Sequence, residues 1–139
     1  MALAAVMPQP QRVVSFQPRG KFMSDRYIYK ICSRQAWAEA VAAGVFAGSA
    51  DDLRDGFIHF STVGQLEETA ARHFAGLADL LLVQVGVASL GDALRWEPSR
   101  GGQLFPHLYG PLQIVHAGKV WPLPVAANGK HVFPEGVLA

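Results

Sequence analysis

The chain has 139 residues, of which 50% are hydrophobic and 17% charged, and its formal net charge is +1. This length suits one domain with one core, the apolar content excludes a disordered polymer, and no apolar run approaches the roughly 20 residues that cross a bilayer. A nucleic-acid partner is disfavoured, because Arg12, Arg19, Lys21 and Arg26 against Asp25 give +3 near the N-terminus and leave −2 elsewhere.

Residues 1–26 contain three prolines and scattered basic residues without helical or strand periodicity, which predicts a disordered N-terminal extension. The alternative is a targeting peptide, but its apolar start, MALAAV, stops before Pro8, too soon for one. Met23 stands just before the first regular segment and is an equally good start of translation. The folded domain is therefore expected to span 27–139.

Residues 27–33, YIYKICS, are aromatic and β-branched, which predicts a strand. Ser33 is a suitable N-cap and Gly44 a suitable C-terminal stop, so a helix is expected from 34 to 43. The apolar residues of that helix share one face, as in a helix packed on a sheet. They are Trp37, Ala40 and Val41.

Cys32 is the chain's one cysteine, so it cannot form an internal disulfide. No Cys and His spacing resembles a structural zinc site. Nothing therefore points to secretion, and a cytoplasmic protein is expected.

A short strand is predicted for FIHF, residues 57–60. Thr62 and Gln65 then form a capping box that opens a second helix, with Gly76 closing it. The apolar residues of this helix lie along one side. They are Val63, Leu66, Ala70, Phe74 and Leu77.

The second half of the chain reads mainly as strands and turns. Strands are expected at 79–87, 94–97 and 112–120, a loop at SRGGQ (99–103), and a compact turn at FPHLYGP (105–111). The proline-rich remainder is expected to be a meander or a sheet edge. The elements together predict one mixed α and β domain (α+β) with two main helices.

The first candidate for a functional site is the segment DGFIHFST. A strand here places His59 and Ser61 on one face, where both can reach one ligand. Their side chains could hold a sugar hydroxyl or a phosphate beside the start of the second helix. The alternative is a buried His59 bonded to a backbone carbonyl, with Ser61 acting only as a helix cap.

The second candidate is LRWEPSRGG, in which Glu97 ends a strand between Arg95 and Arg100. A strand end followed by a glycine loop is a common place for a catalytic carboxylate. The alternative is a solvated Glu and Arg pair, which contributes on the order of 0 to 1 kcal/mol.

The third candidate is LFPHLYGP, in which prolines on both sides fix the chain. His107 and Tyr109 are two residues apart, so an extended backbone points them the same way and offers a proton-transfer group beside an aromatic ring. The alternative is a structural corner in which the Tyr109 hydroxyl bonds to the backbone.

His59, His107 and Glu97 have the chemistry of metal ligands, but nothing in their spacing enforces a metal site, and none is predicted. His73 is expected at a helix edge rather than as a ligand. Neither a glycine-rich phosphate loop nor a GxSxG elbow is present.

Several motifs in order, GVFAGSADDLRDGFIHFST, HFAG, LRWEPSRGG and LFPHLYGPL, resemble the domain-of-unknown-function family 952 of small bacterial and plant proteins. The resemblance runs from Tyr27 to Val120. The activity of that family is unassigned. The fold that the resemblance implies is that of the ADP-ribosyltransferases, a pair of small, crossed antiparallel sheets with helices beside them.

The segment IHFST is also similar to the H-x-S segment of RNA 2′-phosphotransferases, which act on NAD. That similarity implies that His59 contacts a ribose hydroxyl and Ser61 lines the nicotinamide side. It also implies that Tyr109 stacks on a planar base and that Glu97 orients the ribose and stabilises an oxocarbenium-like transition state. The chain lacks the paired-glutamate loop of arginine-modifying transferases and a basic surface for tRNA, so neither of those specific activities is expected.

These observations predict a site for an NAD-derived or other nucleotide ligand, with NAD as a candidate substrate and an ADP-ribosyl-transfer-like reaction. The expected catalytic residues are His59, Glu97 and His107. The expected ligand-binding residues are Ser61, Arg95, Arg100 and Tyr109. The alternatives are a non-catalytic binding module for a small molecule or a protein, and a purely structural role for the same motifs. The sequence indicates neither a definite cofactor nor an oligomeric state.

Overall fold

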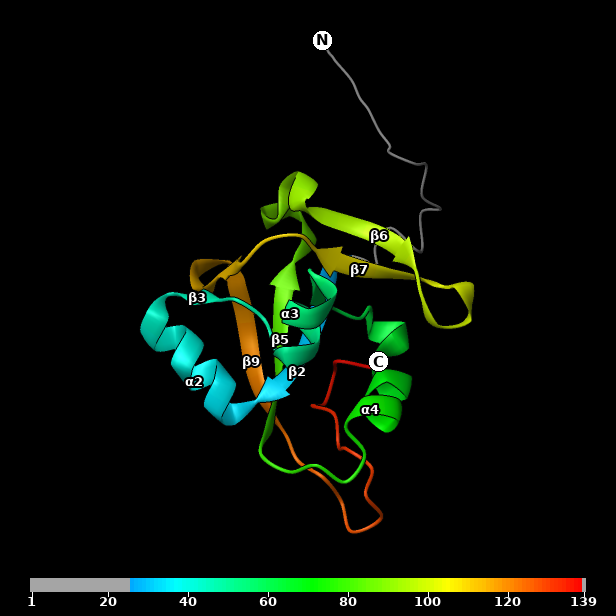
Figure 1. Cartoon of the computed structure of the whole chain (residues 1–139). Helices are drawn as coiled ribbons and strands as arrows, with labels where there is room; N and C mark the ends of the chain where they lie inside the picture. Colours follow the sequence, from blue (N-terminus) through cyan, green and yellow to red (C-terminus); the bar gives the residue numbers. More distant parts are fainter. Residues whose placement is uncertain (1–25, 139) are drawn as a thin grey trace.

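The computed structural model describes residues 26–138 (Figure 1), so the expected disordered extension lies outside the described residues except for Arg26. The fold is mixed α and β, with short helices and small antiparallel sheets. Its strands are β2 Tyr27–Ser33, β3 Val45–Phe46, β4 Ile58–His59, β5 Leu80–Gly86, β6 Leu94–Pro98, β7 Leu104–Leu108, β8 Leu112–Gln113 and β9 Ala117–Leu123. Its α-helices are α2 Arg34–Ala43, α3 Ala50–Asp55 and α4 Leu66–His73.

Three antiparallel sheets organise the described chain. In one sheet β5 lies between β2 and β9, and in another β7 lies between β4 and β6. The third sheet pairs β3 with β8. A single bridge between Tyr29 and Ser61 joins the outer edge of β2 to the residues after β4, so two of the sheets meet there.

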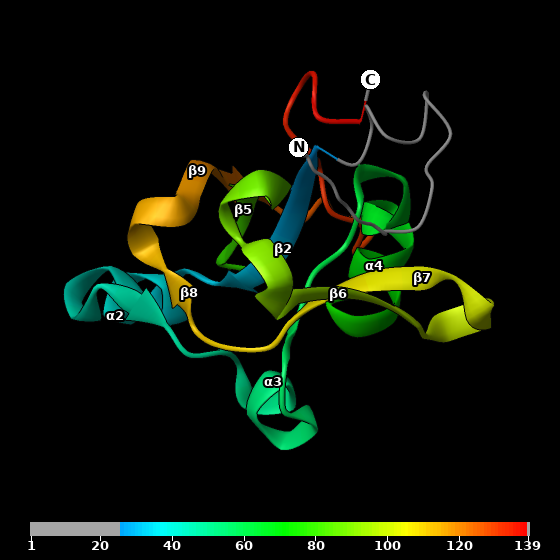
Figure 2. The same ribbon diagram turned by 90° about the horizontal axis from the view of Figure 1, so that it is seen from above.

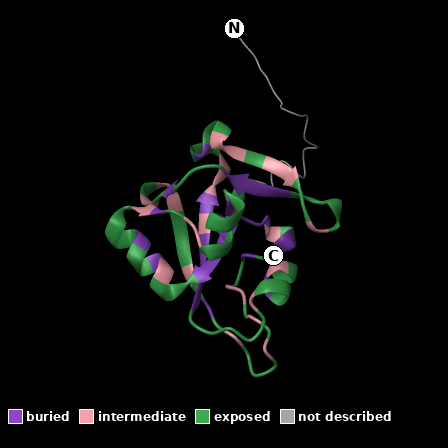
Figure 3. Ribbon diagram, viewed as in Figure 1, coloured by how far each residue is buried: buried purple, intermediate pink, exposed green. Residues whose placement is uncertain are grey.

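The central strand β5 is covered on both faces, which explains its nearly continuous apolar sequence. Leu81 and Val83 pack with α2 on one face, while Leu80 and Leu82 pack with α4 on the other. Viewed from above, α2 and α4 lie on opposite sides of β2 and β5 (Figure 2). The buried side chains follow β5 and β7, whereas the helices expose their outer faces (Figure 3).

The first strand and helix form as the sequence predicts. The Ser33 Oγ accepts a hydrogen bond from the Ala36 amide at 3.0 Å, and Gly44 ends α2 in the left-handed region at a φ of 83°. Trp37 is buried, but Val41 is 52% exposed, so its assignment to the packed face is wrong. This short helix contacts the sheet along a narrow stripe, which leaves Val41 on its flank.

Residues 104–108 form the central strand β7, so the turn predicted over 105–111 is wrong in its first half. Pro106 fits inside this strand because β4 ends beside it. The Pro106 carbonyl still accepts from the Phe60 amide at 3.0 Å, just beyond the end of β4, and its nitrogen points to the same side. The missing amide hydrogen of the proline therefore faces a place where the neighbouring strand has ended.

The second predicted helix opens with the expected cap, since the Gln65 Oε1 accepts from the Thr62 amide at 3.0 Å. It begins as a 3₁₀ turn, Val63–Gln65, continues as α4, and ends at His73 instead of Gly76. Leu77 is 51% exposed and therefore does not belong to the buried stripe. The chain has already turned away before it reaches that residue.

The single strand predicted for 112–120 is divided into β8 and β9 by the 3₁₀ turn Ile114–His116. The reason is that β8 pairs with β3 whereas β9 pairs with β5, so the chain must cross from one sheet to another. Pro122 lies in the edge strand β9, where a missing amide hydrogen is tolerated. Further 3₁₀ turns occur at Val87–Ser89, Gly91–Ala93 and Arg100–Gly102.

Helix α3 has no counterpart among the predicted elements. Ser49 and Asp52 form a capping box at its N-terminus, and Gly56 ends it at a φ of 88°. Its six residues, ADDLRD, are too polar and too few for a helical stripe to be visible in the sequence. Within 26–138, no helix combines the length and the hydropathy that crossing a bilayer would need.

Candidate functional site

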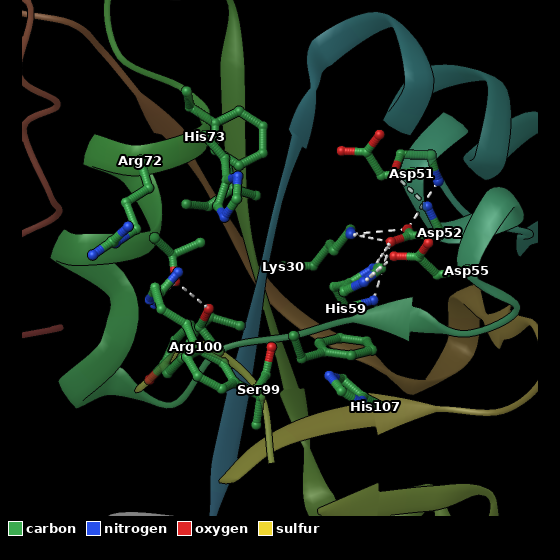
Figure 4. A pocket seen from close by; sticks show the side chains of 18 of the residues that line it. Lys30, Asp51, Asp52, Asp55, His59, Arg72, His73, Ser99, Arg100 and His107 are labelled. Carbon is green, nitrogen blue, oxygen red and sulfur yellow. Dashed lines mark hydrogen bonds and ion pairs between the residues drawn. The ribbon is translucent and has the colours of Figure 1, made fainter. Parts of the chain in front are cut away.

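A cleft of about 590 Å³ opens at the outer edge of β2, between α3 and α4 (Figure 4). Because side chains alternate along a strand, β2 contributes to both walls. Lys30 points toward α3, whereas Tyr29 and Ile31 belong to the apolar cluster under α4. His59 and Ser61 lie beside β2 and face the same cleft.

The wall formed by α3 is organised around Asp52, which is only 2% exposed. Its Oδ2 lies 2.8 Å from the Nζ of Lys30, which is also buried. The same carboxylate accepts from the backbone amides of Ser49 at 2.9 Å and His59 at 3.1 Å. One buried carboxylate thus ties β2, the start of α3 and the start of β4 together.

The His59 ring lies between two carboxylates. Its Nδ1 is 2.6 Å from the Asp52 Oδ1, and its Nε2 is 3.0 Å from the Asp55 Oδ2. Carboxylates only accept hydrogen bonds, so each contact is a hydrogen bond when the facing nitrogen carries a proton. The side chains of His59 and Asp55 are 37% and 35% exposed, so a ligand in the cleft can reach both.

Burial opposes ionisation of Asp52, but the hydrogen bond from His59 and the charge of Lys30 outweigh it and hold its pKa well below the usual 3.8. A carboxyl with a lowered native pKa stabilises the fold above its unfolded pKa, and that stability disappears as the pH falls toward the native pKa.

The gap in unfolding free energy between the wild type and Asp52→Asn should therefore narrow below about pH 4. Urea denaturation at a series of pH values measures this difference in unfolding free energy. A difference that does not change with pH would contradict the lowered pKa of Asp52.

The wall formed by α4 carries hydroxyl and guanidinium groups. The Ser61 Oγ lies 2.9 Å from the Thr69 Oγ1, which also accepts from the Arg100 Nη2 at 3.2 Å. The Glu68 Oε2 lies 3.4 Å from the Arg100 Nε and 2.9 Å from the Arg72 Nε. Two guanidinium groups therefore share one carboxylate, which leaves this wall with an excess of positive charge.

His107 lies at the end of the cleft and connects it to a second cluster on β6. It is the cross-strand partner of both His59 and Arg95. Its Nδ1 is 2.7 Å from the Glu97 Oε1, which also accepts from the Tyr109 hydroxyl at 2.8 Å. The hydrogen bonds from His107 and Tyr109 lower the pKa of Glu97, and the bond to Glu97 raises the pKa of Tyr109.

Phe57 holds these rings in place. Its ring stacks on His107 with centroids 4.0 Å apart and also contacts His59 at 4.6 Å and Tyr109 at 5.2 Å. The Arg95 guanidinium lies over the Tyr109 ring at 4.8 Å. The two histidines are therefore packed against one aromatic side chain between the cleft and the second cluster.

The structure brings some of the predicted site residues together in the cleft and leaves others beside it. The cleft is lined by His59, Ser61, Arg100 and His107, and also by His73, which we expected only at a helix edge. The lining does not include Arg95, Glu97 or Tyr109. Glu97 contacts the cleft residue His107, Tyr109 bonds to Glu97, and Arg95 lies over the Tyr109 ring.

The contacts of these residues differ from the structural alternatives that the sequence leaves open. His59 bonds to carboxylates instead of a backbone carbonyl, and Ser61 bonds to Thr69. Glu97 pairs with His107 instead of an arginine, and the Tyr109 hydroxyl bonds to Glu97 instead of the backbone.

Sequence reasoning missed the residues that hold His59 in place. Lys30 and Asp52 are 22 residues apart, and Lys30 stands in a strand whose apolar character hides it. The available signal was Ser49 followed three residues later by Asp52, a capping box with Gly56 closing the helix. Among residues 26–138, no group of three or more His, Cys, Asp or Glu side chains is arranged to hold a metal ion.

Two solved structures of protein CC0527 from Caulobacter crescentus are similar to this chain. The crystal structure is 46% identical, has a TM-score of 0.78, and covers 81% of this chain and 99% of that one. The solution NMR structure is 50% identical, has a TM-score of 0.69, and covers 76% of this chain and 90% of that one. No curated protein matches the sequence.

Residues 31–120 match the family described as "Protein of unknown function (DUF952)". That range contains the cleft residues from α3 through β7, and the family resemblance predicted from the motifs is thereby confirmed. The chain belongs to the DUF952 family.

Proposed function

We propose that the cleft between α3 and α4 binds a phosphate-bearing nucleotide of the NAD or ADP-ribose class. The observation that carries the proposal is the position of His59, held by Asp52 and Asp55 opposite a wall that bears Arg100 and Arg72. Such a cleft offers hydrogen-bonding groups for a sugar on one side and cations for a phosphate on the other. The small sheets β2-β5-β9 and β4-β7-β6, with helices beside them, support an ADP-ribosyltransferase-like arrangement as part of this proposal.

The anionic part of the ligand would bind the α4 wall. Guanidinium groups match the geometry of phosphate oxygens, and Arg100 is held in place by Thr69 and by stacking on Phe105 at 4.7 Å. In the free protein the two arginines share Glu68, and a phosphate would compete with that carboxylate for them. The Ser61 and Thr69 hydroxyls can donate to further phosphate oxygens.

The ribose would bind the α3 wall. One hydroxyl of a ribose diol can accept from the His59 Nε2 while the neighbouring hydroxyl donates to the Asp55 carboxylate, which this nitrogen faces at 3.0 Å. This arrangement keeps the ribose contact that the resemblance implies for His59. In the proposed arrangement Ser61 contacts the phosphate instead of lining the nicotinamide side. Direct contact with the ligand is not proposed for Arg95, Glu97 or Tyr109, because they do not line the cleft.

Titration calorimetry and thermal shift with ADP-ribose, NAD and nicotinamide test the proposal. ADP-ribose at about 100 times its Kd should stabilise the wild type by roughly 2.7 kcal/mol, whereas nicotinamide alone should do little. His59→Ala and Arg100→Gln should each weaken ADP-ribose binding by about tenfold or more, which corresponds to about 1.4 kcal/mol. Arg34→Gln, on the remote helix α2, is the control and should bind as the wild type does. Absence of binding, or equal binding by all variants, would refute the proposal.

The second candidate is a non-catalytic module that binds the same nucleotides. It is favoured by the position of Glu97, because this carboxylate, to which the resemblance assigns a catalytic role, does not line the cleft. Chromatography after long incubation separates the two candidates. NAD recovered intact from a binding-competent protein identifies the module, and released nicotinamide identifies an enzyme.

A further inference from the structure

We infer that His107 is the proton acceptor of this cleft, and that the cleft transfers the ribosyl carbon of its nucleotide to an oxygen nucleophile, either water or an alcohol. The inference rests on the proposed nucleotide site and adds the class of reaction. It comes from the hydrogen bonds of the two cleft histidines, which lie side by side as cross-strand partners on β4 and β7.

The position of one proton on His107 follows from its partner. The Nδ1 faces the Glu97 carboxylate at 2.7 Å, and a carboxylate only accepts, so Nδ1 carries the proton and the lone pair is on Nε2. Among the residues that the structure describes, none forms a hydrogen bond with this Nε2. His107 is 5% exposed and lines the cleft, whereas Glu97, which faces its Nδ1, does not line it. The opposite edge of the ring, which carries Nε2, is therefore the edge turned toward the site.

The surroundings of His107 fix this orientation. Stacking on Phe57 holds the ring plane, and the Tyr109 hydroxyl holds the same Glu97 oxygen that His107 uses. Among the described residues, the charged and titratable neighbours are Glu97, the Arg95 guanidinium over Tyr109, and His59, whose ring lies edge-on at 5.5 Å. Glu97 is a positioning residue here, because it acts on the ligand only through His107.

His59 has the complementary arrangement. Both of its ring nitrogens face carboxylates, and the Nε2 can donate to the ligand when it carries the hydrogen that bonds to Asp55, whereas the His107 Nε2 can accept. A donor to the ribose and an acceptor for a nucleophile therefore lie together on one face of the sheet. This pairing is what a transfer to oxygen requires.

The proposed step moves one proton and exchanges one bond at the ribose carbon. The nucleophile's O–H bond breaks and its proton moves to the His107 Nε2, while its oxygen forms a bond to C1′ of the ribose. The bond between C1′ and the base nitrogen breaks, and its electron pair leaves with the base, which for NAD is neutral nicotinamide. Glu97 then holds the doubly protonated ring through Nδ1. A positioned base of this kind typically contributes 10²–10⁴-fold in rate.

The first test is independent of turnover. Nitrogen NMR of the imidazole groups at about pH 8 should find His107 protonated on Nδ1 and unprotonated on Nε2. Glu97→Gln should shift population toward the opposite tautomer, while Tyr109→Phe, which keeps the bond between His107 and Glu97, should not. A wild-type His107 protonated on Nε2, or a tautomer indifferent to Glu97→Gln, would overturn the inference.

The second test separates the inference from the proposed function. ADP-ribose affinity and nicotinamide release from NAD are measured in parallel for wild type, His107→Gln and Glu97→Gln. The expected result is affinity preserved within about threefold in both variants, with release lowered by about 10²–10⁴-fold in His107→Gln and less in Glu97→Gln. A wild type that fails to bind ADP-ribose refutes the nucleotide site. A wild type that binds but releases nothing, or a His107→Gln variant with full release, refutes the inference alone.

Discussion

Asp52→Asn should lower the free energy of unfolding by about 3–5 kcal/mol. The change keeps the shape of the side chain but removes the negative charge that faces the buried Lys30 Nζ at 2.8 Å. An ammonium without a counterion in a site only 6% exposed carries a large desolvation cost. Urea denaturation of wild type and variant under the same conditions measures the difference.

Asp51→Asn is the matched control on the same helix. Asp51 pairs with Arg54 at 3.1 Å, but both side chains are about two-thirds exposed, so the loss should be within about 0–1 kcal/mol. Adding Lys30→Met to Asp52→Asn should recover part of the stability, because the unpaired ammonium is then gone. A loss below about 1 kcal/mol for Asp52→Asn would show that the buried pair does not organise the α3 wall.

Gly48→Ala should destabilise the protein by about 2 kcal/mol or more. Gly48 has a φ of 122°, which side-chain-bearing residues rarely adopt, and a Cβ added there would lie 2.8 Å from the Asp52 Cβ. The backbone before α3 would have to shift, and Asp52 would move away from Lys30 and His59. Thermal unfolding measures the stability, and the amide shift of His59, which donates to Asp52 at 3.1 Å, reports the displacement.

Gly86→Ala is the control for that substitution. Gly86 has an ordinary φ of −74°, and a Cβ at this position meets nothing within 4 Å. The expected change is within about 0.5 kcal/mol. Equal effects at Gly48 and Gly86 would mean that the close approach to Asp52 is unimportant.

The sequence predicts the parts of the fold that depend on local signals. The strand over 27–33, the cap at Ser33 and the stop at Gly44 are read from neighbouring residues, and the structure contains all three. The capping box of Thr62 and Gln65 is likewise present. The caps and the helix stop rest on hydrogen bonds between residues at most four apart, so sequence spacing determines them. The strand is visible from its run of aromatic and β-branched residues.

The parts that depend on long-range pairing were not predictable. Pro106 argues for a turn, and it is accepted in the central strand β7 only because β4 ends opposite it. The candidate site also depends on long-range pairing. Strand pairing places His107 beside His59, and the fold places Asp52 against Lys30. The histidines and Glu97 could therefore be nominated from sequence, but Asp52 and Asp55, the carboxylate partners of His59, could not.

An NMR titration of the labelled protein with ADP-ribose, followed through the backbone amides and the histidine side chains, locates the ligand residue by residue. If the nucleotide binds in the cleft, the shifts should concentrate on both of its walls, at His59, Ser61, Thr69 and Arg100, while the remote helix α2 stays unchanged. Absence of saturable shifts, or shifts confined to residues outside the cleft, would contradict it.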